Sequence, residues 1–328
     1  MRDHGGNLDA AMAAHGGDPR EWIDLSTGIN RRPWPLPELP ARAWTDLPTR
    51  ADMARLTEAA HQAYGAPAEA GLVALAGAQA AIQLYPRLAS PGLARILAPT
   101  YNEHAASLRA EGWRVEEVAG LEALAGADLA VLVNPNNPDG LTYAPEDLLA
   151  LLPRVGRLIV DESFVDPTPE SSLGPRAGAE GLILLRSFGK FYGLAGVRLG
   201  FALGAAQETA RLASLSGPWP ISGAAVEIGA RALADSSWRA TTAARLSAEA
   251  LRLDRLAEAA GWSPLGGTTL FRLYETGEAV EAQARLARSR IWSRRFPWSQ
   301  GWLRLGLPGA EAEWRRLAQA LGGPHSRE

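Results

Sequence analysis

The sequence predicts an α/β fold with a mostly parallel sheet and a smaller α+β domain at the C-terminal end. Short apolar runs alternate with helical stretches between residues 71 and 204. Continuous apolar strands separated by helices are typical of a parallel sheet covered on both faces. After residue 212 the chain changes to helices rich in Ala, Arg and Glu, with strand candidates over 269–274 and 302–307.

The apolar runs define the expected strands in order, with helices expected over 78–88 and 101–111 and a turn over 134–140. The expected strands of the sheet are 72–76, 95–98, 129–133, 158–160, 182–185 and 197–203. In such sheets ligands bind at the carboxyl ends of the strands. The polar candidate residues of this sequence follow those ends.

The length of 328 residues exceeds the usual size of a single core, so we expect more than one domain. Residues 1–45, rich in Gly, Pro and Trp, are expected to form an arm that contributes to the small domain and the active site. A large cofactor-binding domain is expected over 46–212 and the small domain over 213–328.

Composition excludes several classes of protein. The chain is 47% hydrophobic and 21% charged, as in globular proteins, and its net charge of −3 lacks the basic footprint of a nucleic-acid binder. No apolar run reaches the roughly 18 residues of a membrane span, and no signal peptide is expected. The absence of cysteine excludes disulfides and thiolate metal sites. We expect a soluble, cytoplasmic protein with no metal site and no membrane partner.

Lysine usage gives the most specific signal. Of the 33 Lys and Arg residues only Lys190 is a lysine, so 32 are arginines. Arginine stays protonated, whereas a lysine can act as an amine nucleophile. Taken alone, the count is equally compatible with a surface lysine that survived by chance. However, Lys190 and Ser187 follow the strand 182–185, and Arg198 comes eight residues later. A lysine for an imine, with a serine and an arginine for a phosphate, is what pyridoxal phosphate requires.

Three further segments lie at strand ends. Asp161 could pair with the pyridine nitrogen of that cofactor, or it could cap a neighbouring helix. Asn137 could donate to the cofactor's phenolic oxygen, or it could belong only to a turn. The backbone N–H groups of the segment 77–79 could hold a phosphate at the start of a helix.

Along the chain the order is 77–79, Tyr101, Asn137, Asp161, Ser187, Lys190 and Arg198. In this order the residues resemble the fold-type I pyridoxal-phosphate enzymes, the aspartate aminotransferase superfamily, and specifically its histidinol-phosphate aminotransferase-like branch. The resemblance implies a seven-stranded type of sheet, pyridoxal 5'-phosphate as cofactor and a homodimer. It implies that Lys190 forms the imine, Asp161 partners the ring nitrogen and Tyr101 stacks on the ring, as the catalytic residues. Asn137 would donate to the ring oxygen. The cofactor phosphate would be held by Ala78, Gln79, Ser187 and Arg198.

Three positions qualify this resemblance. His104 matches a histidine that supports the aspartate in some relatives, although it could equally be an exposed helix residue. Phe164 stands where many relatives have the tyrosine of an Asp-x-x-Tyr motif. Leu47-Pro48 stands where a Tyr-Pro pair often reaches the cofactor phosphate of the partner subunit.

The segments 4–9, 22–30 and 218–222 look like those of the threonine-phosphate decarboxylases of cobalamin biosynthesis; for 4–7 a flexible tail is the alternative. This resemblance implies that Arg304 binds the substrate carboxylate and Arg294 the substrate phosphate, with Arg295 as a competitor for the phosphate. The substrate-binding residues it implies are His4, Gly5, Gly28, Asn137, Arg294 and Arg304.

The expected function is therefore that of a pyridoxal-phosphate-dependent carbon–carbon lyase. It would decarboxylate L-threonine O-3-phosphate, a small phosphorylated amino acid, to (R)-1-aminopropan-2-yl phosphate. A histidinol-phosphate-type aminotransferase is the first alternative, because the residue pattern does not reveal which Cα bond is aligned for cleavage. A non-catalytic binding protein with the same fold is the second alternative, and the complete set of Lys190, Asp161 and Asn137 argues against it.

Overall fold

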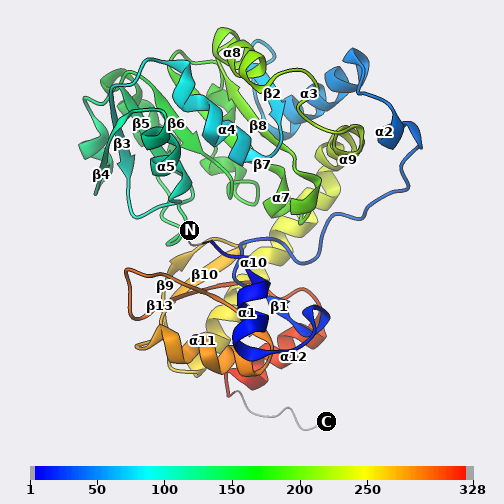
Figure 1. The fold of residues 1–328 in the computed structure, drawn as a ribbon, viewed down its shortest axis with the longest axis vertical. Coiled ribbons are helices and arrows are strands. Elements are labelled where there is room, and N and C mark those ends of the chain that lie inside the picture. The colour runs from blue at the N-terminus through cyan, green and yellow to red at the C-terminus, as the bar shows by residue number, and fades with distance from the viewer. Residues whose placement is uncertain (1–3, 323–328) are drawn as a thin grey trace. The chain divides into compact units, whose positions relative to one another are not determined.

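The computed structural model describes residues 4–322, which form two compact units (Figure 1). The sheet unit comprises residues 34–137 and 141–241. The terminal unit comprises the residues before 34, residues 138–140 and the residues after 241. These limits differ from the predicted boundaries at 46 and 212, because helix α9 (Gly223–Ala234) packs against α2 (Arg42–Thr45) and α3 (Arg50–Tyr64) of the sheet unit.

The sheet unit is built on a seven-stranded sheet in the order β2-β8-β7-β6-β5-β3-β4 (Figure 1). Only β8 runs antiparallel to its neighbours, so the predicted mostly parallel sheet is confirmed. The strands are β2 (Gly71–Leu75), β3 (Leu93–Leu97), β4 (Arg114–Val118), β5 (Leu129–Val133), β6 (Leu158–Asp161), β7 (Leu182–Ser187) and β8 (Gly200–Gly204).

Two details of this sheet differ from the prediction. Strand β4 has no apolar run, because it is an edge strand that carries Arg114, Glu116 and Glu117. Strand β8 begins at Gly200 rather than at residue 197, because residues 195–197 form a 3-10 turn and Arg198 follows in the left-handed region with φ 55°.

The helices of the sheet unit begin and end close to the predicted limits. The predicted helix 78–88 is an α-helix followed by a 3-10 turn, and the predicted helix 101–111 covers Glu103–Ala110. Besides α2, α3 and α9, the helical elements of this unit are α4 (Ala78–Leu84), η2 (Tyr85–Leu88), α5 (Glu103–Ala110), η3 (Leu121–Leu124), α6 (Pro145–Leu151), η4 (Leu152–Arg154), η5 (Pro169–Ser171), η6 (Gly174–Arg176), α7 (Phe188–Phe191), η7 (Ala195–Val197) and α8 (Ala206–Ser216).

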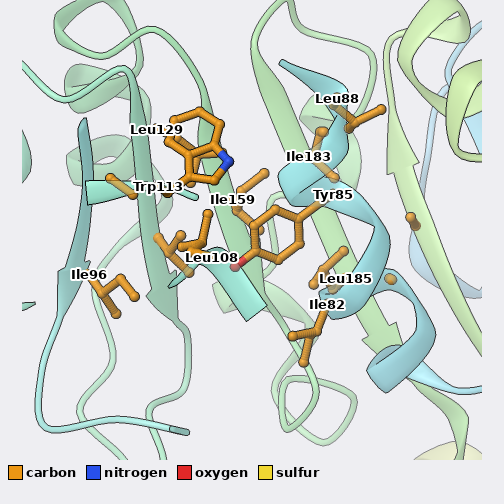
Figure 2. Close-up of a cluster of buried hydrophobic side chains, with 14 of the residues drawn as sticks. Ile82, Tyr85, Leu88, Ile96, Leu108, Trp113, Leu129, Ile159, Ile183 and Leu185 are labelled. Atoms are coloured by element: carbon orange, nitrogen blue, oxygen red, sulfur yellow. The ribbon is translucent and has the colours of Figure 1, made fainter. Parts of the chain in front are cut away.

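One face of the sheet forms a continuous core with α4, η2 and α5. Figure 2 shows Ile159, Ile183 and Leu185 of the central strands facing Ile82 and Tyr85. All five side chains are almost completely buried, and their removal from water supplies the hydrophobic stabilisation of this layer. The core thus fixes α4 and α5 on the strands whose ends carry the polar residues.

The terminal unit has the α+β composition expected for the C-terminal region. Its antiparallel sheet has the order β12-β13-β10-β9, and β1 pairs in parallel with β11. The predicted strands 269–274 and 302–307 correspond to β10 and β13, whereas β9 and β12 were not predicted. The strands are β1 (Ile23–Asp24), β9 (Ser263–Gly267), β10 (Phe271–Glu275), β11 (Ile291–Trp292), β12 (Arg294–Arg295) and β13 (Trp302–Gly306).

The helices of the terminal unit are α1 (Leu8–His15), η1 (Pro19–Glu21), α11 (Ala279–Arg288) and α12 (Glu311–Ala320), and α10 (Ser236–Ala259) begins in the sheet unit. The pairing of β1 with β11 attaches the N-terminal segment to this unit. Arg31 adds a salt bridge to Glu313 of α12. Among the helices of residues 4–322, none is long and apolar enough to cross a membrane.

Candidate active site

A cavity of about 170 Å³ lies in the sheet unit where strands β5, β6 and β7 end. It brings together all the residues that the sequence predicts to bind the cofactor, although they are spread over more than a hundred positions of the chain. These are Ala78, Gln79, Tyr101, Asn137, Asp161, Ser187, Lys190 and Arg198. The carboxyl ends of parallel strands meet at one edge of the sheet, and this explains why strand-end residues converge.

The turn from β2 into α4 forms one end of the cavity. Gly77 has φ +80°, a conformation that favours glycine, and it precedes Ala78 at the start of the helix. A Cβ atom at Gly200 would lie only 2.3 Å from the backbone nitrogen of Ala78, so β8 approaches this turn closely because residue 200 is glycine. The side chain of Arg198 lies against Gly77. One guanidinium group and the first N–H groups of a helix thus line the same end of the cavity.

Asp161 forms another part of the cavity wall and is almost completely buried at the end of β6. Its Oδ1 accepts hydrogen bonds from the backbone nitrogen (2.9 Å) and Oγ (2.5 Å) of Ser163. Its Oδ2 lies 3.1 Å from Nε2 of His104. Burial opposes ionisation, but the hydrogen bonds from His104 and Ser163 outweigh it and hold the pKa of Asp161 below its usual value. Asp161 is therefore a carboxylate at neutral pH.

His104 is completely buried on α5, which excludes the exposed position that the sequence left open. Its second ring nitrogen, Nδ1, lies 3.0 Å from the hydroxyl of Tyr85. The sequence did not indicate Tyr85 or Ser163 as neighbours of the site. An Asp followed two positions later by Ser is the only local signal for Ser163, because such a pair commonly forms a side-chain-to-backbone turn.

Glu162, the residue after Asp161, belongs to a buried network of hydrogen bonds beside the site. Glu162 is completely buried and accepts hydrogen bonds from Arg186 (2.9 Å), Ser172 (2.7 Å) and the backbone nitrogen of Leu173 (2.6 Å). Arg186 also forms a salt bridge with Asp166. This buried network ties the loop after β6, which carries Ser163 and Phe164, to β7.

Lys190 lines the cavity from the short helix α7, which follows β7 directly, so it is not a chance surface lysine. Its Nζ lies 5.5 Å from the centre of the Phe164 ring. Phe164 therefore presents an aromatic face to the lysine. Leu47, which stands in place of the tyrosine of a Tyr-Pro pair, is exposed. It is not among the residues of the sheet unit that line this cavity.

The Tyr101 side chain is hydrogen-bonded to Gln79 and, through Gln79, is linked to Glu103. The Tyr101 hydroxyl donates to Oε1 of Gln79 (3.2 Å), and Nε2 of Gln79 donates to the buried carboxylate of Glu103 (3.0 Å). Both the oxygen and the nitrogen of the Gln79 side-chain amide are thus hydrogen-bonded. Glu103 is a supporting residue that the sequence did not indicate.

The terminal unit contains a second cavity of about 130 Å³. Its lining includes the predicted substrate residues His4, Gly5 and Arg294, together with Arg295 and Ser26. The remaining lining residues are Asn7, Ala10, Gln283, Trp292 and Ser293. Gly28 is buried in the loop after β1 and is not among the described residues that line this cavity.

The N-terminal segment is packed rather than detached. The Gly6 backbone nitrogen donates to Oγ of Ser26 (2.7 Å). A Cβ atom at Gly5 would lie 2.4 Å from the carbonyl oxygen of Ser26, so this contact requires glycine. The Arg304 Nη2 donates to the same carbonyl oxygen (2.9 Å). Ser26 therefore links the segment 4–7 to Arg304.

Of the two predicted substrate arginines, Arg294 lines this cavity, whereas Arg304 is not among the described residues that line it. Arg294 of β12 pairs with Arg304 of β13 across the antiparallel sheet. Arg304 is buried, and burial together with the charge of Arg294 lowers its pKa to about 9, although Asp24 acts in the opposite direction. Like charges directly opposite each other destabilise a sheet, and a bound anion relieves that cost. The arrangement is suited to an anionic ligand.

Gln283 orients the other arginine of the cavity. Its Nε2 donates to the carbonyl oxygen of Ser293 (2.7 Å), and its Oε1 accepts a hydrogen bond from Nε of Arg295 (2.6 Å). Gln283 is buried on α11, and the sequence did not single it out. Both candidates for the phosphate contact therefore line the cavity, and Arg295 is held by a buried side chain.

Comparison with known proteins identifies relatives over nearly the whole chain. The family described as aminotransferase class I and II matches residues 41–321. The threonine-phosphate decarboxylase of Pseudomonas aeruginosa is 43% identical over 330 residues, which cover 98% of each chain. A threonine-phosphate decarboxylase of a Sinorhizobium species is also 43% identical and covers 97% of each chain.

Solved structures confirm the fold class. The histidinol-phosphate aminotransferase of Sinorhizobium meliloti in complex with pyridoxal-5'-phosphate superposes with a TM-score of 0.81 at 20% identity, covering 98% of this chain and 94% of that one. The L-threonine-O-3-phosphate decarboxylase of Porphyromonas gingivalis gives a TM-score of 0.71 at 21% identity, covering 86% and 93%. At 20% and 21% identity, these two structures show only that the fold is shared. The family match over residues 41–321 shows membership of the family. The chain belongs to the aminotransferase class I and II family.

Proposed function

We propose that this chain is a pyridoxal-phosphate-dependent decarboxylase that converts L-threonine O-3-phosphate to (R)-1-aminopropan-2-yl phosphate and CO₂, as a step of cobalamin biosynthesis. The two relatives at 43% identity, both named threonine-phosphate decarboxylases, support the reaction. The structural observation that carries the proposal is the pairing of Arg294 with the buried Arg304, since a phosphorylated amino acid brings two anionic groups.

The sheet-unit cavity fits the cofactor chemically. It contains an amine (Lys190), a carboxylate held in its ionised form (Asp161) and a guanidinium group (Arg198) beside helix N–H groups. When bound there, pyridoxal phosphate supplies an aldehyde that condenses with an amine and a protonated ring that withdraws electrons from the bond to be broken.

The residues of that cavity predicted to bind the cofactor would then each have a role. Asp161 would hold a proton on the ring nitrogen, Asn137 would donate to the ring oxygen and Tyr101 would stack on the ring. The Lys190 amine would hold the aldehyde group of the cofactor and, when free, would serve as the proton donor to the substrate Cα. The cofactor phosphate would be held by Ser187, Arg198 and the N–H groups of Ala78 and Gln79.

The arginines of the terminal unit would bind the substrate's anionic groups. Arg304 binds the carboxylate, and its burial strengthens that charge-assisted hydrogen bond. Arg294 binds the phosphate, with Arg295 as the alternative. His4 and Gly5 of the cavity lining, and Gly28 of the loop after β1, would contribute to this substrate site.

We further propose that the chain forms a homodimer. The family resemblance supports this, and so do three large apolar side chains of the sheet unit, Trp44, Leu47 and Trp219, which are 70%, 61% and 57% exposed. Sedimentation of the purified protein tests it. A cytoplasmic location stays a prediction from the sequence.

Product analysis tests the reaction. The protein is incubated with threonine phosphate and pyridoxal phosphate in the absence of any 2-oxo acid, and CO₂ and the amine product are measured. Stoichiometric CO₂ and aminopropanol phosphate are expected. Turnover that requires 2-oxoglutarate and releases no CO₂ would instead assign the protein as an aminotransferase, for which histidinol phosphate is the substrate to try. Cofactor binding with neither reaction would favour the binding protein.

A further inference from the structure

Three buried side chains form a continuous hydrogen-bonded chain that ends in the sheet-unit cavity. The Tyr85 hydroxyl lies 3.0 Å from Nδ1 of His104, and Nε2 of His104 lies 3.1 Å from Oδ2 of Asp161. Tyr85 and His104 are completely buried, and Asp161 is 3% exposed. Of these three side chains only Asp161 lines the cavity, so it is the member of the hydrogen-bonded chain that reaches the cavity.

The surroundings of Tyr85 decide the direction of these hydrogen bonds. Figure 2 shows its ring packed among apolar side chains, including Ile82, Leu108, Ile159 and Leu185. Within residues 4–322, Nδ1 of His104 is the one hydrogen-bond partner of the Tyr85 hydroxyl. If Nδ1 donated, the hydroxyl hydrogen would point into the apolar cluster without an acceptor, which is costly. The hydroxyl therefore donates and Nδ1 accepts.

The proton of His104 then resides on the other nitrogen. With Nδ1 as acceptor, the hydrogen on Nε2 points to the carboxylate of Asp161, which is the arrangement of the Nε2–H tautomer. The ring contacts of His104 come from Tyr85 of η2, Tyr101 before α5 and Asp161 of β6. Burial, followed by the negative charge of Asp161, raises the pKa of Tyr85 well above its usual value, so the hydroxyl keeps its hydrogen.

We propose that Tyr85 is a positioning residue that holds His104 as the neutral Nε2–H tautomer and thereby leaves the full negative charge of Asp161 available to the cavity. A protonated His104 would neutralise that carboxylate. Asp161 would then hold a proton on a cofactor ring nitrogen less well. The consequence for catalysis rests on the proposed function, whereas the tautomer does not.

The test uses the holoenzyme labelled with ¹⁵N-histidine. The chain has five histidines, and the His104→Gln variant assigns the His104 signals. Between about pH 5 and 8, where histidine ordinarily titrates, we expect one protonated nitrogen, Nε2, and one unprotonated nitrogen, Nδ1. In Tyr85→Phe we expect His104 to bind a second proton within that range. A parent ring that is doubly protonated throughout, or a Tyr85→Phe spectrum identical to that of the parent, overturns the proposal.

Kinetics provides the second readout. Loss of one neutral hydrogen bond predicts that kcat in Tyr85→Phe falls about 2- to 10-fold with little change in KM. The same substitution in the His104→Gln background should have no further effect, because Tyr85 acts through His104. Tyr192→Phe is the matched control, since the Tyr192 hydroxyl is buried and has no hydrogen-bond partner among the described residues. An equal loss in both backgrounds would contradict the proposal. A parent that does not decarboxylate threonine phosphate would contradict only the proposed function, since the ¹⁵N spectra need no turnover.

Discussion

Arg294 and Arg304 stand directly opposite each other on the antiparallel strands β12 and β13. Arg304 also lies over the aromatic rings of Phe271 and Phe296, at 4.9 and 5.9 Å from their centres. Two guanidinium groups at one register position of a sheet repel each other, and burial of one of them increases the cost. We infer that Arg294 and Arg304 serve function at the expense of stability.

The first prediction concerns Arg304→Met. Burial and the charge of Arg294 lower the pKa of Arg304 to about 9. The charge of Arg304 therefore lowers the free energy of unfolding at pH 7. This destabilisation disappears only as the pH rises above about 9. Methionine fills a similar volume beside the two aromatic rings. The variant should unfold at equal or higher denaturant concentration in anion-free buffer, with a gain of about 0.2–1 kcal/mol, and should lose decarboxylation.

Arg288→Met is the matched control, because Arg288 is an exposed residue of α11 outside the cavity. It should change neither stability nor turnover. A loss of more than about 1 kcal/mol in Arg304→Met would mean that the Arg304 hydrogen bond to Ser26 is worth more to the fold than the repulsion costs.

The second prediction separates Arg294 from Arg295. If Arg294 binds the substrate phosphate, Arg294→Ala should reduce the preference for threonine phosphate over threonine about 10- to 150-fold, because a charge-assisted hydrogen bond contributes roughly 1.5–3 kcal/mol. Arg294→Lys should restore part of it, since an ammonium lacks the planar fork. Steady-state kinetics on both substrates measures the effect. An unchanged preference would assign the phosphate to Arg295, and Gln283→Met should then have the larger effect because Gln283 holds Arg295.

Much of the fold was predictable because the buried strands are continuous apolar runs. The convergence of Asp161, Ser187 and Lys190 followed from their positions at the ends of neighbouring parallel strands. The edge strand β4 was missed, since an exposed edge carries charges instead of an apolar run. The boundary at residue 212 differed because the helical composition of 213–241 does not reveal that α9 packs on α3.

The supporting residues were not predictable, and the reason is physical. Tyr85 and Gln283 each lie in an amphipathic helical segment. In such a segment the sequence does not show that a polar side chain is buried and hydrogen-bonded until its partner is known. The partner of Tyr85 is 19 positions away, and that of Gln283 is 12. The opposition of Arg294 and Arg304 depends on strand register, which is set by the whole sheet and not by either residue.

The third prediction concerns the single lysine. Lys190→Ala should abolish the visible absorption of the purified protein and its turnover, because no other lysine can bind the cofactor aldehyde. Borohydride reduction of the parent should fix the cofactor to the peptide that contains Lys190, and mass spectrometry identifies that peptide. Full activity in Lys190→Ala, or cofactor fixed elsewhere, would exclude the proposed chemistry.

The last prediction combines rate and pH at Asp161. Hydrogen bonds from His104 and Ser163 hold the pKa of Asp161 below its usual value, so the folded protein binds this proton less readily than the unfolded chain. The stabilisation is fully present above about pH 4 and is lost as the pH falls through the lowered pKa. Asp161→Asn should therefore lose less stability than the parent on acidification from pH 5 to pH 2, approximately the range in which carboxylates titrate.

The same variant should also lose on the order of 10²–10³-fold in turnover, since the neutral amide cannot hold the ring nitrogen protonated. Asp161→Glu should keep part of that rate. Asp147→Asn, at an exposed position of α6, should follow the parent in both measurements. Parent-like turnover in Asp161→Asn would remove Asp161 from the cofactor site, and a parent-like acid transition would show that its carboxylate is not selectively stabilised in the fold.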